Sequence, residues 1–179
     1  MPQYVVLLRG INVGGRGKLP MTQLRGVLEE IGATDIATYI QSGNVVLHHK
    51  LTGVKALEER IAQGIEDMAG FRPQILMLNR AEFRKAAEAN PFPKAETEKD
   101  GKALHLFFLK GKPKPIDKAA WEAARSNSES YCLIDRVLYL HSPKGMTGSK
   151  LAPKAERWLG VPTTARNWRT VTKLMEMTG

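Results

Sequence analysis

Short apolar blocks of two kinds alternate along the first 79 residues of the chain. Some are brief runs rich in Val, Leu and Ile, which favour strands. Others repeat an apolar residue every three or four positions, which favours helices with one buried face. In chain order, the pattern predicts strand 3–8, helix 21–31, strand 36–40, strand 45–47, helix 53–69 and strand 73–78.

The order of these elements is that of a ferredoxin-like unit. In such a β-α-β-β-α-β unit, two helices cover one face of a four-stranded antiparallel sheet. The Ser42-Gly43 pair supplies the tight turn between the second and third strands. We therefore expect residues 1–79 to form a ferredoxin-like half.

The rest of the chain repeats this order without its last strand. The pattern predicts helix 81–89, strand 104–109, helix 116–125, strands 131–134 and 137–140, and helices 150–159 and 166–177. We expect an α+β fold in which the first half, residues 1–79, packs against a second, related half, residues 80–179, that ends in two helices. One continuous domain is the alternative division.

Charge narrows the class of partner. The chain has 27 Lys and Arg against 18 Asp and Glu, a net charge of +9. A basic surface favours anionic partners, which include nucleic acid, nucleotides, phosphorylated metabolites and anionic lipid. The excess gathers late in the chain, because residues 142–179 contain seven Lys and Arg against two Asp and Glu.

Nothing in the pattern points to export or to a membrane. The apolar stretch after Tyr4 is short and has no basic region before it, so it fits a strand better than a signal peptide. No run approaches the roughly 18 apolar residues of a transmembrane helix. The single cysteine, Cys132, cannot form an internal disulfide, and its apolar neighbours favour a small buried side chain over a nucleophile. We expect a cytoplasmic protein without membrane contact.

A glycine-rich basic segment, residues 9–18, joins the first strand to the first helix. Glycines let backbone amides converge on an anion, and a helix N-terminus adds partial positive charge. The segment matches neither a P-loop nor a dinucleotide fingerprint, so a tight turn with incidental basic residues is an equal alternative. The residues of this segment expected to contact the ligand are Arg9, Asn12, Gly14, Gly15 and Lys18, with Arg16 adding charge.

The turn of the first hairpin is the second candidate. Gly43 and Asn44 supply backbone angles that a tight turn needs, whereas Gln41 is not needed for the turn. A hairpin turn alone is the favoured interpretation. The alternative is that Gln41, Ser42 and Asn44 contact a ligand.

The predicted helix 166–177 is the third candidate. Arg166, Arg169 and Lys173 stand at i, i+3 and i+7 and would share one stripe, with Asn167 beside it. Such a stripe near a helix start suits phosphate oxygens, although a solvated helix face explains it nearly as well. A weaker patch, Lys144–Lys150, resembles a phosphate loop without the correct spacing and equally fits a flexible loop.

The sequence contains few patterns typical of catalytic or metal-binding sites. His48 and His49 are adjacent in a strand, so their side chains point to opposite faces and cannot chelate one metal. His105 and His141 have no partner at ligand spacing, and no Gly-x-Ser-x-Gly elbow is present. We expect no metal site, and the sequence specifies neither a cofactor nor a catalytic residue.

Several stretches resemble one known family nearly end to end. They are Leu-Leu-Arg-Gly-Ile-Asn-Val-Gly-Gly, Met-x-x-Leu-Arg-x-x-Leu-Glu, Thr-Tyr-Ile-Gln-Ser-Gly-Asn-Val, Ser-Lys-Leu and Ala-Arg-Asn-Trp-Arg-Thr-Val-x-Lys-Leu. These motifs are similar to those of the domain-of-unknown-function family 1697. The resemblance implies an α+β fold with a ferredoxin-like first half and a bacterial cytoplasmic protein, and it implies no particular reaction or ligand. Arg169 stands where many relatives have Asn, so no strict role follows for that position.

The motifs coincide with the three candidates, so we expect the loop, the turn and the last helix to converge on one anion-binding cleft. Arg9, Arg166 and Lys173 would hold phosphate there, while Asn12, Gln41 and Asn167 would orient a polar group of the ligand. The leading hypothesis is a binding protein for a phosphate-bearing ligand, with nucleic acid as the first candidate. The strands lack the aromatic pattern of RNA-recognition domains, which favours backbone binding. The alternatives are an enzyme acting on a nucleotide or small phosphorylated substrate, and an interaction module whose motifs are structural.

Overall fold

The computed structural model describes all 179 residues, which divide into two compact units. Unit 1 comprises Met1–Lys85 together with Lys173–Gly179, and unit 2 comprises Ala86–Thr172. Each unit contains one four-stranded antiparallel sheet.

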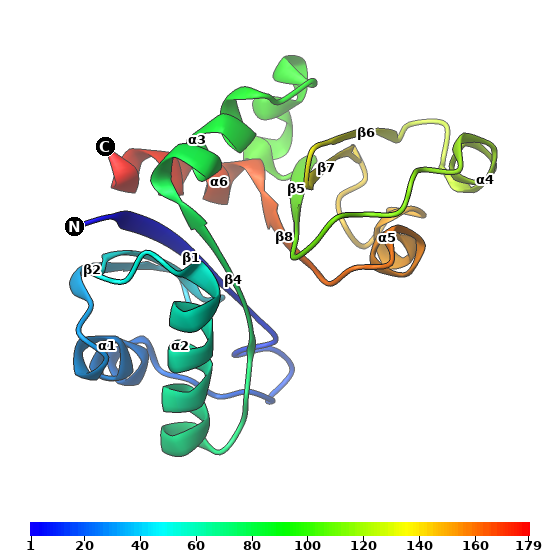
Figure 1. The fold of residues 1–179 in the computed structure, drawn as a ribbon. Coiled ribbons are helices and arrows are strands. Elements are labelled where there is room, and N and C mark those ends of the chain that lie inside the picture. Colours follow the sequence, from blue (N-terminus) through cyan, green and yellow to red (C-terminus); the bar gives the residue numbers. More distant parts are fainter. The chain divides into compact units, whose positions relative to one another are not determined.

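Unit 1 has the predicted ferredoxin-like order. Its elements are β1 (Gln3–Arg9), α1 (Met21–Glu30), β2 (Thr34–Tyr39), β3 (Asn44–His48), α2 (Val54–Ala69) and β4 (Gln74–Asn79). The strands are ordered β2-β3-β1-β4 with antiparallel pairing throughout, and α1 and α2 cover one face of the sheet (Figure 1). The ferredoxin-like prediction for the first half is therefore confirmed.

Buried side chains lie on both faces of β1, a central strand of the unit 1 sheet. Val6 and Leu8 face the helices and pack with residues such as Leu24 and Ile61. Alternate positions point to the other face, and there Val5 and Leu7 are fully buried as well. The centre of this sheet therefore offers no open face, and any polar contact with a ligand must lie at the strand ends or in the loops.

Unit 2 repeats the topology of unit 1. Its sheet is built from β5 (Leu104–Leu109), β6 (Ser130–Ile134), β7 (Val137–His141) and β8 (Thr163–Asn167), with helices α4 (Lys118–Ala124) and α5 (Ala152–Leu159). The order β6-β7-β5-β8 corresponds strand for strand to that of unit 1. Two 3-10 turns, Pro93–Glu96 and Glu98–Gly101, precede β5. The second half is thus a complete β-α-β-β-α-β unit.

Strand β8 corrects the sequence prediction at the end of the chain. Residues 163–167 pair with β5, and the last helix, α6 (Trp168–Thr178), begins only at Trp168. The prediction that the second half lacks its final strand is therefore wrong. Thr163 and Thr164 explain the difference, because these β-branched residues are buried in register with Leu109 and Phe108.

Each sheet is followed at once by a helix that begins in the same way. Asn79 ends β4 and accepts a hydrogen bond from the Glu82 amide at 2.9 Å at the start of α3 (Arg80–Glu88). Asn167 ends β8 and accepts one from the Thr170 amide at 2.9 Å at the start of α6. Both asparagines act as N-caps. The two units therefore share an asparagine N-cap directly after the last strand, although the sequences around it differ.

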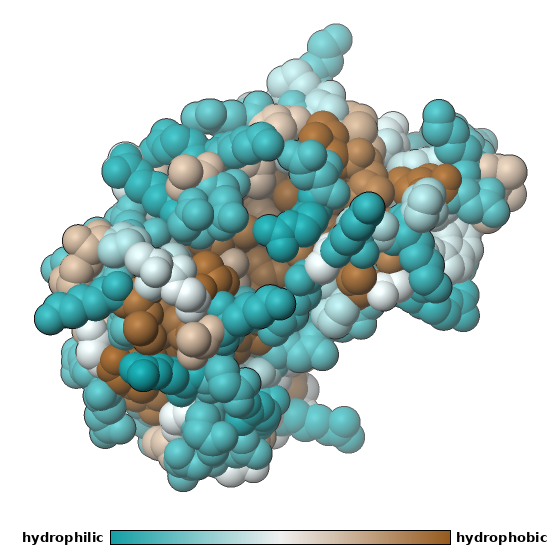
Figure 2. Space-filling model, in the orientation of Figure 1, coloured by the Kyte–Doolittle hydropathy of each residue, from teal (hydrophilic) through white to brown (hydrophobic).

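An aromatic cluster fills the helix side of unit 2. The ring of Trp121 in α4 is almost fully buried and lies 4.9 Å from the ring centre of Tyr131 and 5.5 Å from that of Trp158. Outside the cores, hydrophilic side chains cover most of the visible surface (Figure 2). None of the helices combines the length and the hydropathy required to span a bilayer.

A buried carboxylate holds the start of α5 in place. The side chain of Glu129 is 1% exposed. It accepts hydrogen bonds from the Ser149 hydroxyl and from the amides of Lys150 at 3.1 Å and Ser126 at 2.9 Å. Burial raises the pKa of Glu129, but these hydrogen bonds outweigh burial and hold it below the ordinary glutamate value. The carboxylate therefore occupies an anion-binding position at a helix N-terminus.

His105 is the buried titratable group of β5. His105 pairs in register with Leu140 on β7 and Asn167 on β8, and its Nδ1 is buried without a hydrogen-bond partner. Burial lowers the pKa of His105 from 6.5 to about 4. The ring is thus neutral in the folded protein at neutral pH.

We predict that His105 makes unit 2 sensitive to acid. The unfolded chain takes up the proton near pH 6.5 and the folded chain only near pH 4, so stability falls as the pH drops through this window. The loss approaches roughly 3 kcal/mol at its lower end. Urea unfolding of the wild type and of His105→Leu at several pH values should show a flatter curve for the variant. Parallel curves would contradict the assignment.

We predict that Glu129→Ala lowers the free energy of unfolding by about 3 kcal/mol, because buried donors lose a charged acceptor. The loss should shrink when acetate is added, since acetate can enter the vacated position. Glu122→Ala removes an exposed carboxylate of the same unit and should change little. Urea unfolding with and without acetate is the measurement. An equal effect of both substitutions would contradict the role given to Glu129.

Candidate functional site

The β1–α1 loop is a small, tightly folded structure. Val13 and Arg16 form an isolated bridge, with amide-to-carbonyl distances of 3.3 and 3.0 Å, around the Gly14-Gly15 turn. The amide of Asn12 donates to the Gly17 carbonyl at 2.9 Å. Both turn glycines have positive φ, at 57° and 74°, which a two-residue hairpin turn requires. The loop is therefore a miniature hairpin with a fixed backbone.

The Asn12 side chain ties this loop to the hairpin turn between β2 and β3. Its Nδ2 donates to the carbonyls of Leu19 at 2.9 Å and Gln41 at 2.8 Å, and its Oδ1 accepts from the Leu19 amide at 2.8 Å. Both ends of the amide are thus engaged with backbone groups. Asn12 was expected to orient a ligand, and the structure gives it a bracing role in the loop.

Two glycines allow close contacts in this region, Gly17 within the β1–α1 loop and Gly43 between the turn and the end of β1. A Cβ at Gly17 would lie 2.4 Å from the Gly10 carbonyl oxygen, and one at Gly43 would lie 2.7 Å from the Leu8 Cβ. The Leu8 amide donates to the Gly43 carbonyl at 2.8 Å, which joins the end of β1 to the turn. Only glycine fits at these two contacts.

Some polar side chains of the hairpin turn are buried and others are exposed. Asn44 is fully buried, and its Nδ2 donates to the Tyr39 carbonyl at 3.1 Å and to the Ser42 hydroxyl at 3.0 Å. Gln41 and Ser42 are exposed. The side chain of Asn44 therefore shapes the turn from inside, while that of Gln41 remains available at the surface.

We call the β1–α1 loop, residues 9–19, and the turn, residues 40–43, the basic corner of unit 1. Arg16 and Lys18 are exposed there and form no ion pair or side-chain hydrogen bond. Arg9 is exposed and its Nη1 donates to the Gln74 Oε1 at 3.3 Å. The loop's own bonds leave the amides of Gly14, Gly15 and Gly17 without a partner. Two unpaired cations and three open amides thus lie on one braced segment.

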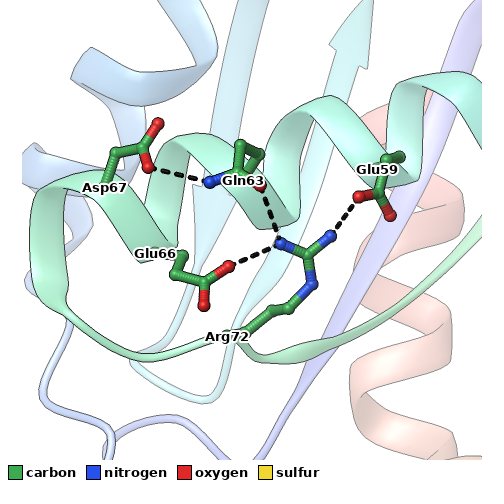
Figure 3. Close-up of polar contacts among 5 residues, drawn as sticks. All are labelled: Glu59, Gln63, Glu66, Asp67 and Arg72. Atoms are coloured by element: carbon green, nitrogen blue, oxygen red, sulfur yellow. Dashed lines mark hydrogen bonds and ion pairs between the residues drawn. The ribbon is translucent and has the colours of Figure 1, made fainter.

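Arg72, another cation of unit 1, is neutralised within its own cluster (Figure 3). Its guanidinium donates to the carboxylates of Glu66 and Glu59 on α2 and to the Gln63 Oε1, at 2.6 Å for Glu66 and 3.2 Å for Gln63. Hydrogen bonds to Glu66 and Glu59 raise the pKa of Arg72. This cluster anchors the α2–β4 connection and leaves Arg72 no role in binding an external anion.

The basic stripe predicted on the last helix does not exist as a stripe. Arg166 and Asn167 lie on β8, so only Arg169 and Lys173 are helical. The Nη1 of Arg166 donates to the Ala165 carbonyl at 2.9 Å, and burial lowers the pKa of Arg166 to about 10. The sequence prediction extended the helical spacing back to Arg166. In the structure, Arg166 and Asn167 pair with β5 and therefore belong to a strand.

The remaining members of that group have partners within their own units. The side chain of Asn167 caps α6. Arg169 pairs with Asp100 at 2.9 Å in unit 2, and Lys173 pairs with Glu176 at 3.0 Å in unit 1. These ion pairs are exposed and weak, but they offset the positive charge expected to attract phosphate.

The Lys144–Lys150 loop shows why the sequence resembled a phosphate loop there. The Ser149 hydroxyl and the Lys150 amide do bind an anion, and that anion is the carboxylate of Glu129. The spacing between Glu129 and Ser149 gives no signal in the sequence, so only the folded structure identifies the occupant. An external phosphate would have to displace a buried carboxylate.

No cluster with the composition of a metal site or a catalytic dyad lies in the basic corner. No group of three or more His, Cys, Asp or Glu residues could hold a metal ion. The His–carboxylate pair of unit 2 joins the His141 Nε2 and the Glu98 Oε2 at 2.8 Å and fastens a 3-10 turn. Residues 9–19 and 40–43 contain no Asp, Glu, His or Cys.

Comparison with known proteins supports the fold but does not assign an activity. No curated protein matches the chain. A solved structure, the conserved bacterial protein SP0830 from Streptococcus pneumoniae, is similar over 99% of each chain with 22% identity and a TM-score of 0.71. At that identity the likeness concerns the fold alone.

A family model settles the relationship that the motifs indicated. The model described as "Protein of unknown function (DUF1697)" matches residues 1–139. This range contains the whole of unit 1 up to Lys85, the β1–α1 loop and the first hairpin turn included, and extends into β7. The chain therefore belongs to the DUF1697 family.

Proposed function

We propose that this protein binds a phosphate-bearing ligand at the basic corner of unit 1, with nucleic acid as the first candidate. The observation that carries the proposal is the pair of unpaired cations, Arg16 and Lys18, on a braced loop with the open amides of Gly14, Gly15 and Gly17. Charged side chains and backbone amides together are the usual means of binding phosphate oxygens.

Rigidity supports binding at this position. The bridge between Val13 and Arg16 and the three bonds of Asn12 fix the backbone before a ligand arrives. A preformed loop loses little conformational entropy on binding, so more of the interaction energy contributes to affinity. Loops held on a rigid scaffold commonly carry binding functions.

Two apolar side chains at the corner favour a ligand larger than inorganic phosphate. Val13 is 65% exposed and Ile40 is 51% exposed, and their neighbours Asn12 and Gln41 are joined by a 2.8 Å hydrogen bond. Ile40 also has a positive φ of 50°, an unfavourable angle for a β-branched residue. Apolar surface beside cations suits a nucleotide unit, which combines a base with a phosphate.

The buried sheet of unit 1 favours contacts at the corner over base stacking on strands. RNA-recognition domains stack bases on exposed aromatic residues of the sheet. Here Val5 and Leu7 occupy the face away from the helices and are fully buried. Binding would therefore depend on phosphate contacts and show little sequence preference.

The composition of the corner favours binding over catalysis. General acid–base chemistry most often uses an imidazole or a carboxylate within reach of the substrate. The corner contains none of these, since residues 9–19 and 40–43 lack Asp, Glu, His and Cys. His105 and Glu129, whose pKa values are shifted, are buried structural groups of unit 2. An enzyme acting on a small phosphorylated substrate is therefore the weaker alternative.

We predict that Arg16→Gln with Lys18→Gln weakens binding of a labelled single-stranded RNA. Fluorescence anisotropy across a potassium chloride series should show micromolar or tighter wild-type binding at low salt. In the double variant, the slope of log affinity against log salt should fall by about 1.4, roughly 0.7 for each lost phosphate contact.

The matched control is Lys55→Gln with Arg60→Gln on α2, which removes the same charges from exposed positions of unit 1. This control should keep the wild-type slope. Equal slopes in the two variants would mean that net charge, and not the basic corner, attracts the RNA. Absence of wild-type binding at low salt would remove nucleic acid as the ligand.

A further inference from the structure

Unit 2 has its own basic segment at the position that corresponds to the β1–α1 loop. The β5–α4 connector, residues 110–118, follows the first strand of its sheet as residues 9–20 follow β1. The Leu109 amide donates to the Arg136 carbonyl of the β6–β7 turn at 2.9 Å, and the Leu8 amide makes the equivalent 2.8 Å bond to Gly43. The two units thus place a basic segment at the same end of the same sheet topology.

The connector carries three lysines, Lys112, Lys114 and Lys118, that form no ion pair. Four of its nine residues are lysines, and Lys112, Lys114 and Lys118 are exposed without an ion pair. Its single acid, Asp117, accepts a hydrogen bond from the Ala120 amide at 3.1 Å and caps α4. The exposed Arg136 lies in the adjoining turn. The charge is therefore available to a partner.

The backbone of the connector is fixed. The Lys110 amide donates to the Pro162 carbonyl at 2.9 Å, and the Lys114 amide donates to the Leu159 carbonyl at 2.8 Å. Pro113 and Pro115 restrict the intervening φ angles. The aliphatic part of Lys114 also packs on Gly160, where a Cβ would lie 2.8 Å from the Lys114 Cε.

The sequence of the connector separates its lysines by prolines. In an extended, proline-rich segment each residue advances about 3.1 Å, so alternate residues lie about 6 Å apart. Lys112 and Lys114 alternate in this way along the connector. A row of separated ammonium groups matches a partner with a row of separated negative charges.

We propose that the connector Lys110–Lys118 is a second nucleic-acid-binding surface, which contacts the sugar–phosphate backbone of a single strand without reading bases. A lone phosphate suits it less well, because Pro113 and Pro115 remove two of the amide donors that a phosphate-binding loop uses. A membrane surface suits it less well, because stable binding there needs exposed apolar side chains, and Ile116 packs against the core of unit 2.

The surface is independent of the basic corner, since it lies in unit 2 and shares no residue with that site. Lysine contacts to phosphates are electrostatic, so they release counterions and weaken as salt increases. Each contact in a single-strand complex contributes about 0.7 to the salt slope. Loss of Lys112, Lys114 and Lys118 should therefore lower the slope by about 2.

The test measures anisotropy of a labelled oligouridine with full-length protein across a potassium chloride series. The triple variant Lys112→Gln, Lys114→Gln, Lys118→Gln should show that lower slope and weaker binding at low salt. The corresponding triple Lys→Arg variant should bind as the wild type does. The matched control replaces Lys94, Lys102 and Lys144 by Gln, which are exposed lysines of the same unit, and should keep the wild-type slope.

Three results would overturn the proposal. One is an equal loss in the connector variant and its matched control, which would assign the effect to net charge. Another is an unchanged slope in a connector variant with wild-type circular dichroism and melting temperature. The third is a connector variant that loses binding to phosphatidylglycerol vesicles and keeps binding to RNA. Because the corner variant Arg16→Gln with Lys18→Gln is measured in parallel, failure at either site is distinguishable from failure at the other.

Discussion

Burial of both faces of the central strands β1 and β5 is the constraint on which the rest of this structure depends. Val5 and Leu7 on one face of β1, and Val6 and Leu8 on the other, are all fully buried. All six residues of β5 are buried as well. Burial disfavours charged groups at these positions. His105, the polar residue of β5, is accordingly held neutral by the fall in its pKa, and the exposed cations of the two proposed sites lie at strand ends and in connectors. The basic corner of unit 1 and the lysine connector of unit 2 both follow a central strand.

Two positions in the protein favour an anion, and they differ in what they bind. At the start of α5, the Ser149 hydroxyl and nearby amides receive the carboxylate of Glu129, so the position is filled by the chain itself and stabilises the fold. In the β1–α1 loop, the open amides and the unpaired Arg16 and Lys18 face solvent. The same physical preference, cations and amides for negative charge, therefore contributes to stability in unit 2 and to proposed binding in unit 1.

The hydrogen bonds of the basic corner distinguish the residues that shape it from those that project from its surface. Asn12 and Asn44 belong to the family-like motifs, and their side-chain amides are engaged with backbone groups and the Ser42 hydroxyl. Gln41 and Lys18 project from the segments that these asparagines hold. A motif residue can thus be essential to a site without contacting a ligand, because loss of its bonds would release the loop that presents the cations.

Periodicity in the sequence determined the ferredoxin-like unit 1, most helices and strands of unit 2, and the glycine-rich basic loop, because local patterns of apolar residues and glycines fix these features. The sequence could not place β8, since Thr163–Asn167 becomes a strand through pairing with β5, a contact distant along the chain. It also could not show that Glu129 fills the Ser149 position or that Asn12 joins two loops. Hydrogen bonds between residues far apart in sequence leave no local pattern, so tertiary structure alone decided which polar residues are paired and which cations stay open.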